Sequence, residues 1–247
     1  MKSKNANHKI LRRILLAVLC ILAVGLIAFG IYVSDYYHAD AAAAQALETD
    51  ETVTVEQLDS GTMAFVPAKP AAGLIFYPGG KVEYTAYAPL LHDLAQEGIL
   101  CVLVKMPCNL AVLDINAADG IREQFPELEV WYIGGHSLGG SMAASYAAKH
   151  ASEYSGLILL AAYSTADLSG AGLRVVSLYG TEDMVLNMEK YRGNRVNLPA
   201  DTREYVIEGG CHAQFGSYGA QEGDGTPRIS AEEQRQLAVD YITEAIR

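Results

Sequence analysis

The sequence predicts an α/β protein in which a mostly parallel, twisted sheet of about eight strands carries helices on both faces, behind an N-terminal membrane helix. Two observations lead to this fold class. From residue 52 onward, short apolar runs rich in β-branched residues alternate with longer amphipathic segments. Ahead of them, residues 14–33 form a run of 20 residues without a charged side chain.

The first 34 residues are expected to form a membrane anchor. A helix of 20 residues rises about 30 Å, which matches the hydrocarbon thickness of a bilayer. Five basic residues precede the run within residues 1–13, and acidic residues begin only at Asp35. The positive-inside rule therefore puts residues 1–13 in the cytoplasm, a signal anchor at 14–34 and the rest of the chain outside the cell membrane. A cleavable signal peptide is the alternative, although its apolar core is usually only about 7 to 15 residues.

Residues 35–51 are expected to be a linker, and residues 52–247 a single domain. The first two strand candidates follow each other closely and predict a hairpin. The later ones alternate with helical segments, which predicts parallel pairing. The strand candidates are residues 52–58, 62–67, 73–78, 99–105, 129–134, 156–161, 173–180 and 203–209.

Four amphipathic segments predict the helices that cover the sheet, and these are residues 84–98, 109–125, 138–150 and 229–247. The last one begins with a capping box, because Ser230 and Glu233 can each satisfy a backbone N–H of the other. Only 11 residues, 162–172, connect the sixth and seventh strand candidates, where many enzymes of this architecture insert a lid. We therefore expect no lid domain and an open site above the sheet.

The charge balance and the cysteines exclude several classes of function. Five of the 18 Lys and Arg lie in residues 1–13, which leaves 13 against 29 acidic residues and a net charge of −16. Nucleic acid is therefore excluded as a partner, because phosphate binding needs a basic surface. The four cysteines form no CxxC motif and no metal-ligand cluster, so we expect neither a metal site nor a cofactor.

One short motif carries chemistry. Residues 135–139, Gly-His-Ser-Leu-Gly, fit G-x-S-x-G between a strand candidate and a helical segment. Such a turn holds its serine at strained backbone angles, and the flanking glycines keep other Cβ atoms away, so the hydroxyl projects above the sheet. The start of the next helix stabilises negative charge beside it. A glycine-rich turn with a serine N-cap is the alternative, so Ser137 as a nucleophile needs partners elsewhere.

Two later loops can supply those partners. A serine hydroxyl needs a base within hydrogen-bond reach, and the base needs an orienting acid. In a parallel sheet such residues lie on loops at the carboxyl ends of strands. Asp183 and His212 follow the last two strand candidates, and we expect them to be the acid and the base. Glu182 could replace Asp183. His212 is chosen by elimination, because the other histidines lie in the N-terminus, the linker, helical segments or the serine motif.

An oxyanion hole would complete the site. Its usual donors are the backbone N–H after the nucleophile and one from the loop after the third strand. The first donor is then that of Leu138. For the second we expect Gly80, with Gly79 and Lys81 as alternatives. The tyrosines nearby, Tyr84 and Tyr87 among them, are interpreted as packing residues.

Five blocks of sequence resemble a known family: YPGGKVEYTAYAPLL, VKMPCNLAVL, GGHSLGG, LYGTED and IEGGCHAQFGSYGAQEGDG, in this order. Together they are similar to the small, lidless bacterial α/β-hydrolases related to the dienelactone-hydrolase group, over residues 52–247. The resemblance implies the α/β-hydrolase fold, with Ser137 as nucleophile, Asp183 as acid and His212 as base. Dienelactone hydrolases proper use a cysteine nucleophile, so lactone chemistry is not implied.

Cys108 and Cys211 depart from the usual pattern of that family. Both fall on loops near one end of the sheet, where a disulfide would brace the loop of His212. Two free thiols are the alternative, since the pairing of cysteines cannot be read from sequence.

The function expected from the sequence is a membrane-anchored, extracytoplasmic serine hydrolase of small ester-like molecules, which works through an acyl-enzyme and without a cofactor. An acyltransferase would use the same three residues, with a hydroxyl or an amine in place of water. A non-catalytic binding module on a hydrolase scaffold is the third hypothesis, since a fold does not fix a function.

Overall fold

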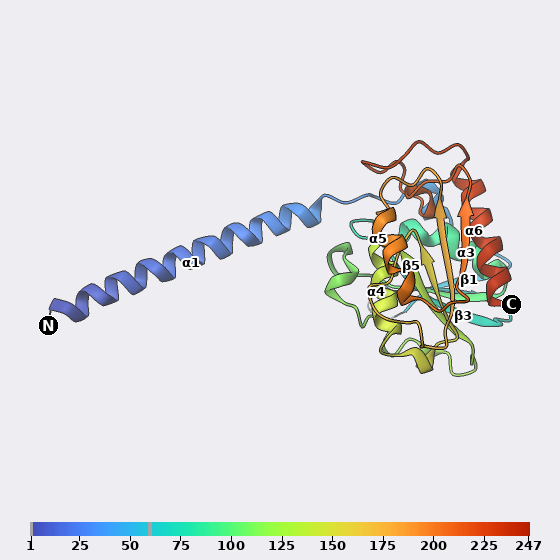
Figure 1. Ribbon diagram of the computed structural model, residues 1–247, viewed down its shortest axis with the longest axis horizontal. Helices are drawn as coiled ribbons and strands as arrows, with labels where there is room; N and C mark the ends of the chain where they lie inside the picture. Colours follow the sequence, from blue (N-terminus) through green and yellow to red (C-terminus); the bar gives the residue numbers. More distant parts are fainter. Residues whose placement is uncertain (1, 59–60) are drawn as a thin grey trace. The chain divides into compact units, whose positions relative to one another are not determined.

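The computed structural model describes residues 2–58 and 61–247, with side chains from residue 11 onward (Figure 1). It divides into two units, one ending at Tyr36 and one running from Tyr37 to Arg247. The first unit contains helix α1 (Lys2–Ser34). Its stretch Leu11–Ser34 is long and apolar enough to cross a membrane, with a mean hydropathy of 3.1, although a signal sequence would meet the same criterion.

The second unit is built on one sheet, which confirms the predicted fold class. Among the described residues, eight strands pair in the order β1-β2-β4-β3-β5-β6-β7-β8. Strand β2 is antiparallel to β1 and to β4, and every other neighbouring pair is parallel. All eight strands overlap the segments expected from the sequence. Their bounds are β1 (Val53–Gln57), β2 (Met63–Pro67), β3 (Ala72–Tyr77), β4 (Ile99–Leu103), β5 (Trp131–His136), β6 (Gly156–Leu160), β7 (Arg174–Gly180) and β8 (Arg203–Ile207).

Burial along the strands follows their position in the sheet. Strands β3, β4, β5 and β6 are buried at every residue. They lie in the middle of the sheet, covered on both faces, and this is why they are continuously apolar rather than alternating. The edge strands β1 and β8 are largely exposed or half-buried.

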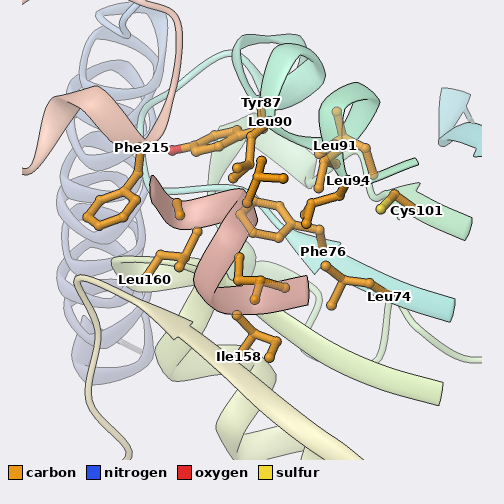
Figure 2. Packing of buried hydrophobic residues seen from close by; sticks show 14 of the residues in the cluster. Leu74, Phe76, Tyr87, Leu90, Leu91, Leu94, Cys101, Ile158, Leu160 and Phe215 are labelled. Atoms are coloured by element: carbon orange, nitrogen blue, oxygen red, sulfur yellow. The ribbon is translucent and has the colours of Figure 1, made fainter. Parts of the chain in front are cut away.

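Helices cover both faces of the sheet. Figure 1 shows α3 (Ala88–Gln96) and α6 (Ala231–Ile246) on one side and α4 (Leu138–Ala147) and α5 (Met188–Gly193) on the other. The side chains of α3 pack with strand residues such as Leu74, Phe76 and Ile158 in one buried cluster (Figure 2). A second cluster joins α4 to the opposite face of the sheet. The predicted capping box of α6 is formed.

Two expectations are corrected by the structure. Residues 109–125 form no α-helix but separate short 3-10 turns, which include Ala111–Leu113 and Arg122–Gln124. Positive φ angles stand at its first residue, Asn109 (54°), and within it at Gly120 (74°), and an α-helix can neither begin at the one nor continue through the other.

The expected linker, residues 35–51, is the second correction. The compact unit begins at Tyr37, which forms a parallel bridge with Val82. Helix α2 (Ala41–Gln45) follows, capped by Asp40, and its Ala43 is fully buried. The residues after 36 therefore belong to the domain, because they pair with it and contribute to its core.

The order of the strands fixes where a site can form. Strand β3 has β4 on one side and β5 on the other, so the direction in which the sheet is built reverses there. Ligands of open α/β sheets bind at such a switch point, beyond the carboxyl ends of the strands. The loops after β3 and β5, which hold Gly80 and Ser137, meet at this point.

Candidate active site

Ser137 lies on the sharp turn between β5 and α4. Its backbone has φ 51° and ψ −121°, a conformation that is strained for any residue with a Cβ. The turn is tight because Gly135 and Gly139 pack against each other and against the end of β3. A Cβ on Gly135 would come within 2.8 Å of the Gly139 carbonyl carbon. Ser137 is half-buried and its side chain makes no capping bond to the helix, so the hydroxyl stays available above the sheet.

Asp183 and His212 meet at the same edge. His212 Nδ1 lies 2.9 Å from Asp183 Oδ2, and their side chains are 2% and 0% exposed. The second carboxylate oxygen, Asp183 Oδ1, accepts the backbone N–H groups of Val185 (3.0 Å) and Leu186 (2.8 Å). These bonds fix the carboxylate, so Asp183 can in turn fix the orientation of the imidazole.

Glu182, the alternative acid, points elsewhere. It forms an ion pair with Arg228 at 2.6 Å, and its side chain is 29% exposed. The structure therefore brings Asp183, and not Glu182, to His212. The ring of His212 packs on that of His136, with centroids 4.5 Å apart, which places it beside the residue that precedes Ser137. Within the described residues no hydrogen bond joins Ser137 to His212. In free enzymes this bond is often long and tightens only when substrate binds.

Two residues that the sequence did not single out hold the acid and base loops. The Gln234 side chain of α6 accepts the backbone N–H of Cys211 and donates to its carbonyl, both at 2.8 Å, and it is fully buried. Asp224 accepts the N–H of Ala213 (2.8 Å) through one oxygen and that of Met184 (3.3 Å) through the other. Asp224 thereby ties the residue after His212 to the residue after Asp183.

We call residues 78–81, which follow β3, the oxyanion loop. The hydrogen bonds of this loop distinguish between its three candidate donors. Gly79 donates its N–H to the Tyr87 hydroxyl (3.1 Å), and Lys81 donates its N–H to the Asn109 carbonyl (2.9 Å). In the described part of the chain, the N–H of Gly80 has no protein acceptor, and neither has that of Leu138. A Cβ on Gly80 would lie 2.8 Å from Leu138 Cδ2, so the two residues adjoin. Two neighbouring unpaired amides are what an oxyanion hole requires.

His136 and Tyr87 form a buried pair beneath this loop. Tyr87 Oη lies 2.7 Å from His136 Nδ1 while it accepts the N–H of Gly79. Tyr87 is fully buried and His136 is 1% exposed. Burial, and then the nearby His212, hold the pKa of His136 well below its ordinary 6.5. A neutral His136 can accept the tyrosine proton, which leaves the hydroxyl oxygen free to accept from Gly79.

The expected disulfide is not formed. Cys108 and Cys211 are both free in the structure, Cys108 exposed and Cys211 buried. Strands β4 and β8, which precede the two cysteines, have four strands between them, so they lie about 24 Å apart at the usual strand spacing. A disulfide needs Cα atoms within about 7 Å. Burial raises the pKa of the Cys211 thiol to about 11, which leaves it protonated and unreactive.

Two cavities lie beside the loops that surround the candidate site. Neither the cavity of about 540 Å³ beside the Cys211 loop nor that of about 380 Å³ beside the Cys108 turn is lined by Ser137. Residues 161–173, between β6 and β7, contain no helix or strand. Within the described residues no group of three or more His, Cys, Asp or Glu is placed to hold a metal ion.

Comparisons with known proteins identify the family and the fold. A profile described as the alpha/beta hydrolase family matches residues 73–236, well over half of the chain, so the protein belongs to the alpha/beta hydrolase family. No curated protein matches the chain.

Solved structures show the same fold. Est1E from Butyrivibrio proteoclasticus is 12% identical with a TM-score of 0.56, covering 79% of this chain and 99% of that one. Dienelactone hydrolase from Anabaena variabilis is 14% identical with a TM-score of 0.54, covering 80% and 99%. Carboxyl esterase 2 from Tuber melanosporum is 11% identical with a TM-score of 0.56, covering 86% and 92%. At identities this low, the structural matches establish the fold alone. Together with the family match they support a hydrolase.

Proposed function

We propose that the protein is a membrane-anchored, extracytoplasmic serine hydrolase that cleaves a carboxylic ester through Ser137, His212 and Asp183. The observation that carries the proposal is the buried pair of His212 and Asp183 at the sheet edge where the G-x-S-x-G serine lies. Two backbone N–H groups of the following loop hold the Asp183 carboxylate in place. The neighbour named as a carboxyl esterase supports the ester class. The apolar run of residues 14–33 within α1 and the basic residues before that run support an anchor with the domain outside.

The reaction follows from the roles of these groups. Ser137 Oγ attacks the ester carbonyl as His212 Nε2 takes its proton. Asp183 Oδ2 holds the Nδ1–H of the imidazole and stabilises the charge that forms on it. The N–H groups of Gly80 and Leu138 bind the oxyanion, and each such donor contributes about 3 kcal/mol to the transition state. The protonated His212 then gives its proton to the leaving alcohol.

Water completes the cycle. It enters the place of the alcohol, loses a proton to His212 and attacks the acyl-enzyme, which releases the carboxylic acid and restores the Ser137 hydroxyl. No step needs a metal or an organic cofactor. Ser137 is only half-buried, so water can reach the acyl-enzyme from solvent.

A fluorophosphonate probe tests the proposal, because it reacts only with an activated serine. The wild-type chain should be labelled, and Ser137→Ala should lose all labelling together with the hydrolysis of 4-nitrophenyl acetate. Ser141→Ala is the matched control. Ser141 lies one turn further along α4, and its Oγ donates to the Tyr163 carbonyl (2.8 Å). Loss of this hydroxyl should leave labelling unchanged. Unlabelled wild type, or equal labelling of Ser137→Ala, would refute the mechanism.

A further inference from the structure

The first residues of the domain attach to it beside the oxyanion loop. Tyr37 donates its N–H to the Lys81 carbonyl (2.8 Å) and accepts the N–H of Glu83 (2.8 Å), on either side of its bridge with Val82. Gly80, which we assign as an oxyanion donor, is two residues before Val82. The segment that leads into the domain is thus held against the site and not against the opposite edge of the sheet.

The same segment is also held by the loop that follows His212. The Tyr37 hydroxyl accepts the N–H of Glu222 (3.0 Å), and its ring packs on that of Tyr218 with centroids 5.6 Å apart. Asp40 donates its N–H to the Ser217 carbonyl (2.9 Å). Contacts to two loops of the site make this attachment a fixed part of the domain.

Very little chain separates this attachment from the apolar helix. Ser34 is the last residue of α1, and only residues 35 and 36 lie between it and Tyr37. Three residue steps of fully extended chain reach about 11 Å, a quarter of the thickness of a bilayer with its headgroups, about 40–45 Å. The number of residues sets this limit whatever the direction of the helix. If α1 spans the membrane, the attachment beside the site is therefore held at the level of the headgroups.

Three of the exposed large apolar side chains of the domain lie at the same edge of the sheet. Among the described residues after Tyr37, five large apolar side chains are exposed, and three of these are Val112 (52%), Leu113 (50%) and Met184 (73%). Val112 and Leu113 lie in the loop after β4, and Met184 in the loop after β7, both at the carboxyl ends of the strands. Burial of apolar side chains around a site in the interfacial region of a bilayer lowers the free energy of the bound protein.

Resting on the proposed function, we propose that the substrate is an acyl lipid ester held in the membrane that anchors the chain, rather than an ester dissolved in water. The position of the serine relative to the nearby cavities fits such a substrate. Ser137 lines neither the cavity of about 540 Å³ nor that of about 380 Å³, so neither of these holds an acyl chain at the serine. A lipid needs no such cavity, because its chains stay in the bilayer while the ester carbonyl reaches Gly80 and Leu138.

The test uses the full chain in phosphatidylcholine vesicles that contain a fluorogenic diacylglycerol ester, with 4-nitrophenyl acetate as the dissolved substrate. A flexible Gly/Ser insertion of about 20 residues after Ser34 has an r.m.s. length of about 25 Å and frees the site from the bilayer surface. We expect it to lower lipid hydrolysis by about fivefold or more and to leave hydrolysis of the dissolved ester unchanged. Leu113→Asp should likewise lower lipid hydrolysis and leave hydrolysis of the dissolved ester unchanged.

The same insertion between Gly170 and Ala171 is the matched control. This exposed turn precedes β7, at the amino ends of the strands, so both activities should stay at the wild-type level. A wild-type chain that hydrolyses only the dissolved ester, or an insertion after Ser34 that leaves lipid hydrolysis unchanged, would overturn the membrane substrate while the serine hydrolase stands. Failure of the wild type on both esters would instead overturn the proposed function itself.

Discussion

Replacing Tyr87 by Phe tests whether one buried hydroxyl fixes the oxyanion loop. The hydroxyl accepts the N–H of Gly79 (3.1 Å) and lies 2.7 Å from His136 Nδ1. Both partners are buried with it, because a Cβ on Gly79 would come within 2.8 Å of His136 Nδ1 and His136 itself is 1% exposed. The substitution keeps the ring in place and removes only the oxygen.

The expected loss of stability follows from what the substitution leaves unpaired. One backbone N–H and one ring nitrogen lose their partner without access to water, and each such group costs about 1–3 kcal/mol. The hydroxyl no longer has to be removed from water on folding, which offsets part of this cost. We therefore expect the free energy of unfolding to fall by about 2–4 kcal/mol.

Tyr132→Phe is the matched control. Tyr132 is also fully buried, but its hydroxyl has no hydrogen-bond partner among the described residues, so its removal should leave stability unchanged within about 0.5 kcal/mol or raise it. Trp131 is the one tryptophan of the chain and is 1% exposed, so its fluorescence reports unfolding of the domain in urea, with the full chain in detergent micelles.

Catalysis gives a second measurement on the same variants. Without the Tyr87 hydroxyl the Gly79 N–H has no acceptor, the loop shifts, and the Gly80 donor moves from its place beside Leu138. We expect kcat for ester hydrolysis to fall about tenfold, which corresponds to about 1.4 kcal/mol of lost transition-state stabilisation. Equal stabilities and equal kcat values for Tyr87→Phe and Tyr132→Phe would show that the hydroxyl has no such role.

Three further predictions concern other parts of the molecule. Ser137→Gly should be more stable to urea than Ser137→Ala by about 1–3 kcal/mol, since glycine adopts φ 51° and ψ −121° without strain; a less stable glycine variant would contradict the strained turn. The unfolded chain protonates His136 below its ordinary pKa of 6.5 while the folded chain, with its lowered pKa, does not. Wild type should therefore lose about 1.4 kcal/mol of stability per pH unit below that value relative to His136→Gln, and a gap that is constant from pH 7.5 to 5 would argue against a neutral buried ring. Cys108 is the one exposed thiol of the domain, so a membrane-impermeant maleimide should label intact cells through it, and labelling that needs permeabilised cells would place the domain in the cytoplasm.

The central strands were predictable because each is a run of consecutive buried, mostly apolar residues. Each of the central strands is buried at every position, which required an apolar run bounded by turns. The positions of Ser137, Asp183 and His212 were predictable for a related reason. Each lies on the loop after a predicted strand, which is β5, β7 or β8, and the carboxyl ends of parallel strands share one edge.

Helix formation over residues 109–125 could not be judged from its amphipathic pattern. The apolar residues Ala111, Ala118 and Ile121 do reach the core, as the pattern requires. Ala111 does so from a 3-10 turn and the other two from the turns after it, because the left-handed backbone at Gly120 redirects the chain between Ala118 and Ile121. Periodicity predicts which side chains are buried, but several backbone paths can bury them.

The residues that support the site escaped prediction because their partners are distant in the sequence. Gln234 contacts Cys211 from 23 positions away, and Tyr87 meets His136 from 49 positions away. No local spacing marks either pair. Asp224 falls within the block IEGGCHAQFGSYGAQEGDG after His212, but only the fold shows that its two oxygens hold the loops of Asp183 and His212 together.

The attachment of Tyr37 follows the same logic and has the largest consequence for function. An apolar helix and a short polar segment predict an anchor, but they leave open which edge of the domain the chain joins. That depends on the bridge between Tyr37 and Val82, which are 45 positions apart in the sequence. Val82 comes directly after the oxyanion loop. Because β3 lies where the strand order reverses, the loop beyond it is both the place for an oxyanion hole and a place where an additional segment can pair. On the proposed membrane substrate, a chain joined at the amino ends of the strands would hold Ser137 away from the bilayer, so the end of the sheet to which the apolar helix is attached would decide whether a lipid reaches the serine.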